Sequence, residues 1–192
     1  SFLADIHARD HVVKGKIGIS AAGKILAIEI DDLTGIGPYS VYPRSSGMEV
    51  NQVCNLTGGP YKFDNYKARG RVVFLNKPPM CQYRAVGHPI AITVTEGLVE
   101  MAASAIGMES MKMRKLNMVA DDDYPNKTVS GIPVENLSHQ ASTDKLMEMV
   151  NYDEIRTEQK QLRQEGIYRG VGFAALIEVT NPGPAFYGVG GA

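Results

Sequence analysis

Hydrophobic and polar residues alternate with a period of two in two neighbouring stretches near the start of the chain. "HVVKGKIGIS" and "ILAIEIDD" each place an aliphatic residue at almost every second position, which is the period of a strand with one buried face. The sequence "AAGK" between them supplies turn residues, including Gly23. We predict a β-hairpin whose buried face carries Ile17, Leu26, Ile28 and Ile30.

A spacing of three and four residues marks a long helix after Pro89. Its apolar stripe consists of Ile90, Val94, Leu98, Met101 and Ala105. Proline suits the first helical turn, and Gly107 suits the position just beyond the last turn. Gly97 lies inside the helix and costs about 1 kcal/mol relative to alanine. We expect a closely packed helix neighbour to explain it.

The remaining segments complete a mixed pattern. Residues 35–60 are rich in Gly, Pro, Ser and Asn, which predicts a long ordered loop around a short helix near Met48–Leu56. "RGRVVFLN" predicts a strand, and "MESMKMRKLNMV" predicts a second, short helix. "STDKLMEMVNYDEIRTEQKQLRQEG" predicts one or two surface helices with Leu146, Met149 and Val150 facing inward. "GVGFAALIEVT" is nearly all apolar and predicts a strand buried on both faces. Without a strict βαβ repeat, the fold class is α+β, with a mixed sheet and packed helices.

The composition and net charge of the chain limit the kinds of partner that it is expected to bind. Of the 192 residues 44% are hydrophobic and 21% charged, as in a globular domain. The net charge of -1 argues against nucleic acid, because phosphate contacts need an excess of cations. No apolar run is long enough to span a bilayer. Cys54 and Cys81 match no disulfide framework or zinc spacing, so we expect a reducing, cytoplasmic setting. The chain begins within "SFLADIHARD" and ends in "FYGVGGA", from which we expect a segment of a longer polypeptide.

Most residues with metal-binding or catalytic chemistry are isolated along the chain. His7 and His11 are four residues apart, but the zinc-protease pattern needs Glu after the first His, and Ala8 stands there. We interpret this segment as a polar entry to a strand. The run Asp121–Asp123 is interpreted as solvated surface, and the four histidines of the chain form no ligand set.

The stretch "PPMCQYRAVGHP" is chemically more varied than a connector needs to be. Backbone N–H groups in a Gly-containing loop at a helix N-terminus can bind an anion, and Arg84 adds a fixed cation. The residues alone leave two alternatives open, a plain loop that enters a helix and an anion-binding site.

The order of several motifs resembles one family, the large subunit of the molybdenum hydroxylases. These motifs are "FLADIHARDHVV", "GKILAIEIDDLTGIGPYS", "NLTGGPYKF", "NKPPMCQYRAVGHPIAITVTEGLVEMAASAIGM" and "MRKLNMV". The family includes xanthine dehydrogenase, aldehyde oxidase and aerobic carbon monoxide dehydrogenase. "YRAVGHP" with its helix is the strongest match, and Arg114, Asn117 and Val119 occupy the family's Arg-x-x-Asn-x-hydrophobic pattern.

The resemblance implies a molybdenum–molybdopterin cofactor, with a cytosine dinucleotide as one form of the pterin. It implies that the main chain at Gln82, Tyr83 and Arg84 donates hydrogen bonds to the metal's oxygen ligand and the pterin, and that Val50 and Val86 line the substrate pocket. The implied reaction is oxidative hydroxylation of an aldehyde, an N-heterocycle or a CO-like substrate with oxygen from water. Electrons leave through iron–sulfur and FAD groups on partner subunits or domains.

Departures from the family pattern limit what is carried over. Purine-oxidising relatives have Arg where Val50 stands, which disfavours purines. Cys81 stands where carbon monoxide dehydrogenase has its copper-binding cysteine, but the surrounding run differs, so copper ligation is disfavoured. The family's general-base Glu falls beyond Ala192, so no catalytic residue is assigned here. We expect the isolated chain to be inactive.

One partial molybdopterin-binding domain is therefore expected over residues 1–192. Residues 1–80 form the hairpin, long loop and strand, residues 81–119 the cofactor loop and helices, and residues 120–192 the surface helices and buried strand. Expected partners are the remainder of the large subunit, iron–sulfur and flavin subunits and a small-molecule substrate, in an oligomer with no membrane. The alternatives are a non-catalytic assembly module of this family and an unrelated anion-binding α+β domain.

Overall fold

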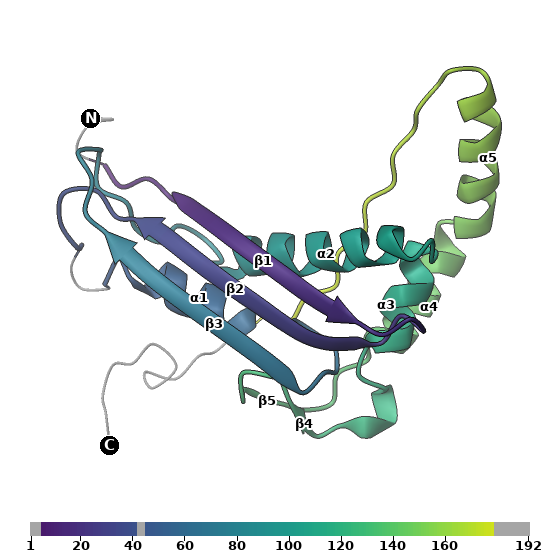
Figure 1. The fold of residues 1–192 in the computed structure, drawn as a ribbon, viewed down its shortest axis with the longest axis horizontal. Coiled ribbons are helices and arrows are strands. Elements are labelled where there is room, and N and C mark those ends of the chain that lie inside the picture. The colour runs from purple at the N-terminus through teal and green to yellow at the C-terminus, as the bar shows by residue number, and fades with distance from the viewer. Residues whose placement is uncertain (1–4, 42–44, 179–192) are drawn as a thin grey trace.

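A three-stranded mixed sheet is the centre of the molecule (Figure 1). The computed structural model describes residues 5–41 and 45–178. Strand β1 (His11–Ile19) pairs antiparallel with β2 (Ile25–Gly35), as the alternation predicted. Strand β3 (Asn65–Val73) pairs parallel with β2, because helix α1 (Met48–Leu56) carries the chain back between them. The predicted α+β class and mixed sheet are confirmed.

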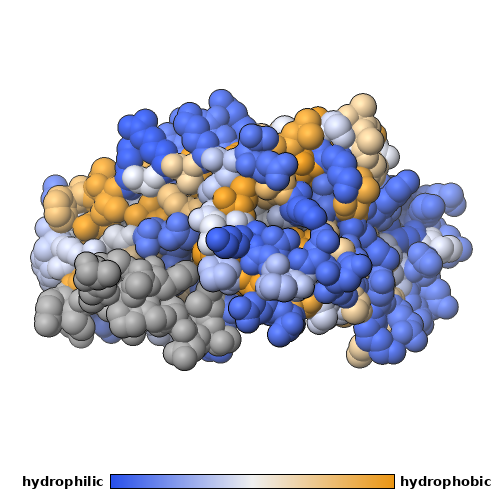
Figure 2. All heavy atoms as spheres, turned by 90° about the horizontal axis from the view of Figure 1, so that it is seen from below, coloured by the Kyte–Doolittle hydropathy of each residue, from blue (hydrophilic) through white to orange (hydrophobic). Residues whose placement is uncertain are grey.

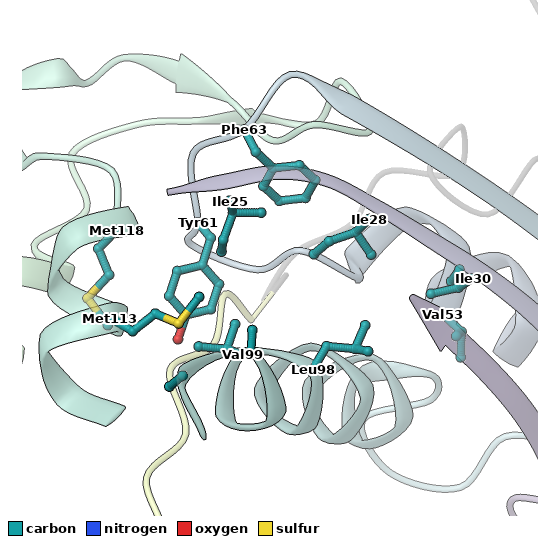
Figure 3. Packing of buried hydrophobic residues seen from close by; sticks show 12 residues of the cluster. Ile25, Ile28, Ile30, Val53, Tyr61, Phe63, Leu98, Val99, Met113 and Met118 are labelled. Atoms are coloured by element: carbon teal, nitrogen blue, oxygen red, sulfur yellow. The ribbon is translucent and has the colours of Figure 1, made fainter. Parts of the chain in front are cut away.

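Two helices cover one face of this sheet. Helix α1 and the long helix α2 (His88–Ala105) pack against the strands, with contacts to each other. In the core, the buried Ile28 and Ile30 of β2 lie opposite Leu98 and Val99 of α2 and close to Val53 of α1 (Figure 3). Full burial of an aliphatic side chain contributes about 1.5–3 kcal/mol, so this layer holds the sheet and helices in one unit.

The smaller elements gather at one end of the sheet (Figure 1). They are helices α3 (Ser110–Asn117), α4 (His139–Met149) and α5 (Tyr152–Gln164), the 3-10 turn η1 (Asp121–Asp123), and the two-stranded ribbon of β4 (Asn126–Lys127) and β5 (Pro133–Val134). No single helix of the described residues is long and apolar enough to cross a membrane. Helices α2 and α3 pass that test only as a pair bent by 117°, and both contribute to the core.

The Arg-x-x-Asn motif ties this end to the sheet. Arg114 is buried, and its Nε donates to Glu96 of α2 over 2.8 Å. Glu96 also accepts from the Tyr61 hydroxyl at 2.9 Å and from the Ala175 amide at 3.1 Å. Asn117 accepts from the Ile25 amide at 2.9 Å and so anchors the start of β2. The motif is therefore a set of buried polar links that hold α3 to its neighbours.

The buried face of the hairpin differs at one position from the prediction. Leu26 is 50% exposed, whereas Ile25 is buried. The register shifts between Gly18 and Ile19, so that Ile19 pairs with Ile25 and Gly18 with Ala27. Leu26 is the extra residue of this irregularity, and such a bulge changes the face on which the residues before it lie.

Helix α2 has the predicted bounds, but its buried face was wrong in part. Met101 is 69% exposed, and the buried positions besides Leu98 are mostly small residues: Ala91, Thr95, Val99, Ala102 and Ala103. Small side chains let the helix approach the sheet, where a Cβ on Gly15 would lie 3.1 Å from Leu98. No atom of the described residues lies within 4 Å of a Cβ placed on Gly97, so the expected close helix neighbour is also wrong.

Two predictions for the C-terminal part are corrected. Leu146, Met149 and Val150 of the α4 region are 44%, 72% and 43% exposed instead of facing inward. Residues 170–178 form no strand, and their burial alternates, with Phe173 and Ala175 packed on the core and Val171 and Leu176 exposed. No described strand pairs with this segment, so its apolar residues cover the core on one side only. The last two residues of the predicted strand lie outside the described residues.

Candidate functional site

The loop of residues 80–87, between β3 and α2, is fixed by the N-terminal segment that runs beside it. His7 and Met80 form a parallel bridge. The His7 amide donates to the Pro79 carbonyl, and the Cys81 amide donates to the His7 carbonyl, both at 3.0 Å. These contacts join residues that are more than seventy positions apart in the sequence. The position of the loop therefore depends on long-range contacts.

Three consecutive residues of the loop are left-handed. The φ angles of Arg84, Ala85 and Val86 are 39°, 63° and 49°. None of the three is glycine, and this region costs an L-residue about 1–2 kcal/mol; for β-branched valine it is a genuine outlier. Such a run persists only where the surrounding structure enforces it, and strain of this kind clusters at functional sites.

The carbonyl groups of this left-handed turn all point to partners inside the protein. The Arg9 guanidinium donates to the carbonyls of Tyr83 at 2.8 Å and Val86 at 3.4 Å, and also to that of Arg84. The Ala85 carbonyl accepts from the His88 amide at 2.9 Å and from the His88 ring Nδ1 at 2.7 Å. Every carbonyl from Tyr83 to Val86 therefore accepts a hydrogen bond from another group of the protein.

Among the described residues, the amide groups of residues 82–86 have no such partners. Within the described residues, none of the N–H groups of residues 82–86 donates a hydrogen bond. Successive amides in a turn, next to the N-terminus of a helix such as α2, form a concave donor set for an oxyanion or a metal-bound oxygen. The arrangement fits a group that accepts several hydrogen bonds from the main chain.

Gly87 fits the loop closely against α1. Its amide donates to Oε1 of Gln52 at 2.9 Å. A Cβ at this position would lie 2.5 Å from the carbonyl oxygen of Glu49 and 2.7 Å from Cβ of Gln52. Only glycine allows α1 and the start of α2 to approach this closely.

The predicted site residues are distributed over this loop and α1. Tyr83 is 67% exposed, Arg84 is exposed, and Gln82 and Val86 are half-buried. Val50 is buried on α1, where a Cβ on Gly70 would lie 2.6 Å from it. The loop thus brings four of the five residues together, while Val50 packs beneath β3.

Cys81 is buried at the start of the loop. Its thiol donates to Oε1 of Gln82 at 2.8 Å, and it is not in a disulfide with Cys54. Among the residues that the structure describes, no group of three or more His, Cys, Asp or Glu side chains could hold a metal ion. The chain's own described side chains therefore supply no metal cage beside the loop.

The sequence analysis missed a buried charged cluster on α1, β1 and β2. His11 Nδ1 lies 2.9 Å from Asp32, and its Nε2 lies 3.4 Å from Glu49. The side chains are 4%, 0% and 2% exposed, respectively. Burial alone would lower the pKa of His11, but its hydrogen bonds and charge interactions with Asp32 and Glu49 raise it to about 9. His11 is therefore an imidazolium at neutral pH.

One signal for this cluster was present in the sequence. Asp32 lies in phase with the buried Ile28 and Ile30 of β2, and a carboxylate on a buried face needs a cationic partner. Oε1 of Glu49 is buried and has no hydrogen-bond partner among the described residues. Because the Glu49 carbonyl borders Gly87, the cluster lies next to the loop.

Exposed apolar side chains also gather at this end of the sheet. These side chains are 39–69% exposed and belong to Ile6, Val12, Tyr39, Val72, Phe74 and Tyr83. The start of β1 and the ends of β2 and β3 meet here because of the strand directions. In Figure 2, hydrophobic residues gather at the end of the molecule opposite α5. At the α5 end, hydrophilic residues predominate.

The comparison with known families agrees with this geometry. The family model for the molybdopterin cofactor-binding domain matches residues 1–118, which is more than half of the chain and includes the whole loop. The chain belongs to this family. The molybdopterin-binding match covers the sheet, α1, α2 and α3, and ends near Asn117.

Individual relatives of this molybdopterin-binding domain are larger proteins. The chain is 28% identical over 183 residues to the 6-hydroxypseudooxynicotine dehydrogenase complex subunit gamma of Paenarthrobacter nicotinovorans, and the match covers 92% of this chain and 23% of that protein. The crystal structure of quinoline 2-oxidoreductase from Pseudomonas putida 86 superposes with a TM-score of 0.88 at 28% identity, over 98% of this chain and 24% of that one.

A more distant structure shares the fold. Carbon monoxide dehydrogenase from Oligotropha carboxidovorans has a TM-score of 0.74 at 21% identity, over 84% of this chain and 20% of that chain. The chain therefore spans about a quarter of the length of the relatives that it matches.

Proposed function

We propose that this chain forms the part of a molybdenum hydroxylase large subunit that borders the molybdenum–pterin centre. In this proposal the amides at Gln82, Tyr83 and Arg84 donate hydrogen bonds to the cofactor. The supporting observation is the left-handed loop whose carbonyls are all taken while the amides of residues 82–86 have no acceptor among the described residues. The match of residues 1–118 to the molybdopterin-binding family supports the identity of the bound group.

The role of this chain is to orient and to stabilise charge. When bound, the cofactor supplies the two-electron oxidation that hydroxylates an electron-poor carbon with oxygen from water. The amides of the loop are fixed before any ligand arrives, so they need no reorganisation as negative charge develops on the group they contact. Arg84 adds a cation at the same edge. The general base comes from a part of the subunit beyond this chain.

The substrate class follows from the aliphatic side chains. Val86 of the loop offers no side-chain hydrogen bond to a substrate. The position of Val50 carries no cation either, and this valine is buried beneath β3, so a purine would find no charged partner there. We therefore propose an aldehyde or an N-heterocycle as substrate. The Cys81 thiol is buried and donates to Gln82, which argues against the copper chemistry of a CO-oxidising centre.

The partners follow from the surface around the site. The exposed apolar side chains at the loop end form a surface that the remainder of a large subunit would cover. Iron–sulfur and FAD groups on further subunits would take the electrons away, in a cytoplasmic oligomer. The alternative is a non-catalytic assembly module that has the same fold and binds no cofactor.

The proposal is tested by molybdenum content in the intact protein, purified with its partner subunits. Ala85→Pro removes one amide of the loop and forbids its left-handed φ of 63°. Asn136→Pro creates the same conflict, at a φ of 50°, in an exposed turn outside the loop. We expect Ala85→Pro to lose most of the molybdenum and Asn136→Pro to retain it.

Two results would contradict the proposal. One is a folded, assembled wild-type protein without molybdenum, which would favour the assembly module. The other is equal molybdenum content in both proline variants, which would mean that the loop does not border the metal centre.

A further inference from the structure

We infer that Arg9 is a positioning residue that sets the left-handed conformation of residues 84–86 and thereby the direction of the loop amides. That the amides contact a cofactor rests on the proposed function, whereas the control of the loop by Arg9 does not. Arg9 lies in the polar segment that leads into β1.

The Arg9 guanidinium alone contacts three carbonyls of the loop. Nε and Nη2 of Arg9 donate to the carbonyls of residues 83, 84 and 86. Among the described residues Arg9 forms no ion pair with a carboxylate, so its donors serve the loop. A planar guanidinium has five N–H donors in a fixed fork and can join several carbonyls, whereas the three donors of a lysine ammonium all lie on one nitrogen.

The positive charge of Arg9 also stabilises the turn electrostatically. Three carbonyl dipoles point toward the same region, and without a cation they would repel one another. A peptide unit whose carbonyl turns toward Arg9 has its N–H directed the opposite way, because the two groups are antiparallel in a trans peptide. By holding the carbonyls of residues 83, 84 and 86, the guanidinium therefore sets the direction of the N–H groups of residues 84, 85 and 87. Of these, the Arg84 amide is one of the proposed cofactor donors, and the Gly87 amide donates to Gln52.

Arg9 is itself held in a strained conformation. Its φ is 69°, a position that glycine would occupy at lower cost. The residues on both sides are anchored: His7 to the loop, and Asp10 through its carbonyl to the Gly35 amide at 2.8 Å and through its carboxylate to Lys77 at 2.8 Å. A strained arginine fixed from both sides indicates that its side chain is needed at this place.

The experiment measures amide hydrogen exchange in the intact protein. The reporters are the Gly87 amide, which donates to Gln52, and the His88 amide, which donates to the Ala85 carbonyl. We compare the wild type with Arg9→Gln, Arg9→Lys and the control Arg71→Gln. The control removes a guanidinium that makes two hydrogen bonds with the half-buried Asp31 on the sheet.

We expect exchange at Gly87 and His88 to accelerate about tenfold or more in Arg9→Gln, because the loop opens locally. Arg9→Lys keeps the charge and one donor contact and should give an intermediate rate. In Arg71→Gln the two amides should exchange as in the wild type. Equal rates in Arg9→Gln and the wild type would overturn the inference.

A second readout separates this inference from the proposed function. Molybdenum content and the electron paramagnetic resonance spectrum of the Mo(V) state report the surroundings of the metal. We expect Arg9→Gln to lower the content and alter the spectrum, with partial recovery in Arg9→Lys. If Arg9→Gln opens the loop but leaves both unchanged, the positioning role toward the cofactor is overturned. If the wild type holds no molybdenum, the proposed function fails, and the exchange data alone decide the role of Arg9.

Discussion

At the scale of single residues, the loop before α2 has non-glycine residues in left-handed backbone conformations, which glycine adopts at lower cost. Ala85 shows this most simply, because its methyl group is the only difference from glycine and its φ is 63°. Glycine would relieve the strain of the left-handed region, about 1–2 kcal/mol, but would add about 0.4–1 kcal/mol of unfolded-state entropy cost.

We therefore predict that Ala85→Gly leaves the protein equally stable or more stable, by up to about 1.6 kcal/mol. The measurement is the free energy of unfolding from denaturant titration. The control is Ala120→Gly, where φ is -68° and the same change should destabilise by about 0.4–1 kcal/mol. A larger loss at position 85 than at position 120 would show that the left-handed turn is not strained.

At the scale of elements, α2 contains Gly97 and follows the N-cap residue Gly87, and the surroundings of these two glycines are opposite. A Cβ on Gly97 meets no atom of the described residues within 4 Å, whereas a Cβ on Gly87, next to the start of the helix, would collide with the backbone of α1. Packing among the described residues therefore requires glycine at position 87 but not at position 97.

We predict that Gly97→Ala stabilises the isolated chain by about 1 kcal/mol, because alanine is the better helix former. Gly87→Ala should destabilise by about 1–3 kcal/mol, the range typical of forced overpacking. Thermal unfolding of both variants and the wild type measures the difference. Destabilisation by Gly97→Ala would mean that a neighbour approaches this face of α2.

The same helix shows how far sequence patterns predict this fold. Its bounds were predicted from Pro89, Gly107 and the helical period. Its buried face was predicted from the large apolar residues, whereas the small residues Ala102 and Ala103 are the ones that pack on the sheet. The hairpin was predicted from the period of two, while the irregularity at Leu26 depends on pairing between strands. Local patterns therefore predict element type well and the orientation of an element less well.

In the candidate site, too, some residues could be predicted from local sequence and others could not. The varied composition of the loop and its resemblance to a family singled out Gln82, Tyr83 and Arg84. The partners that shape the loop could not be read from local sequence, because Arg9 contacts carbonyls 74–77 residues further along the chain. His11, whose partners are 21 and 38 residues away, was missed for the same reason.

At the scale of the whole molecule, the His11 cluster joins β1, β2 and α1, so its charge state affects the stability of the entire sheet-and-helix unit. The pKa of His11 is about 9 in the folded protein, whereas an unperturbed histidine, as in the unfolded chain, has a pKa of 6.5. A pKa raised by folding contributes stability that is fully present below the unfolded value and is lost as the pH rises through the folded value.

We therefore predict that the free energy of unfolding falls by about 2 kcal/mol between about pH 6.5 and about pH 8.5. The window ends there because burial raises the pKa of the Cys54 thiol to about 11, so that this thiol would add its own loss of stability at higher pH. His11→Gln should be less stable than the wild type at the lower pH and should lose most of the slope. His139→Gln, on the peripheral helix α4, should keep it. An equal slope in His11→Gln and the wild type would mean that the imidazolium between Asp32 and Glu49 does not hold the three elements together, and that other groups set the pH response.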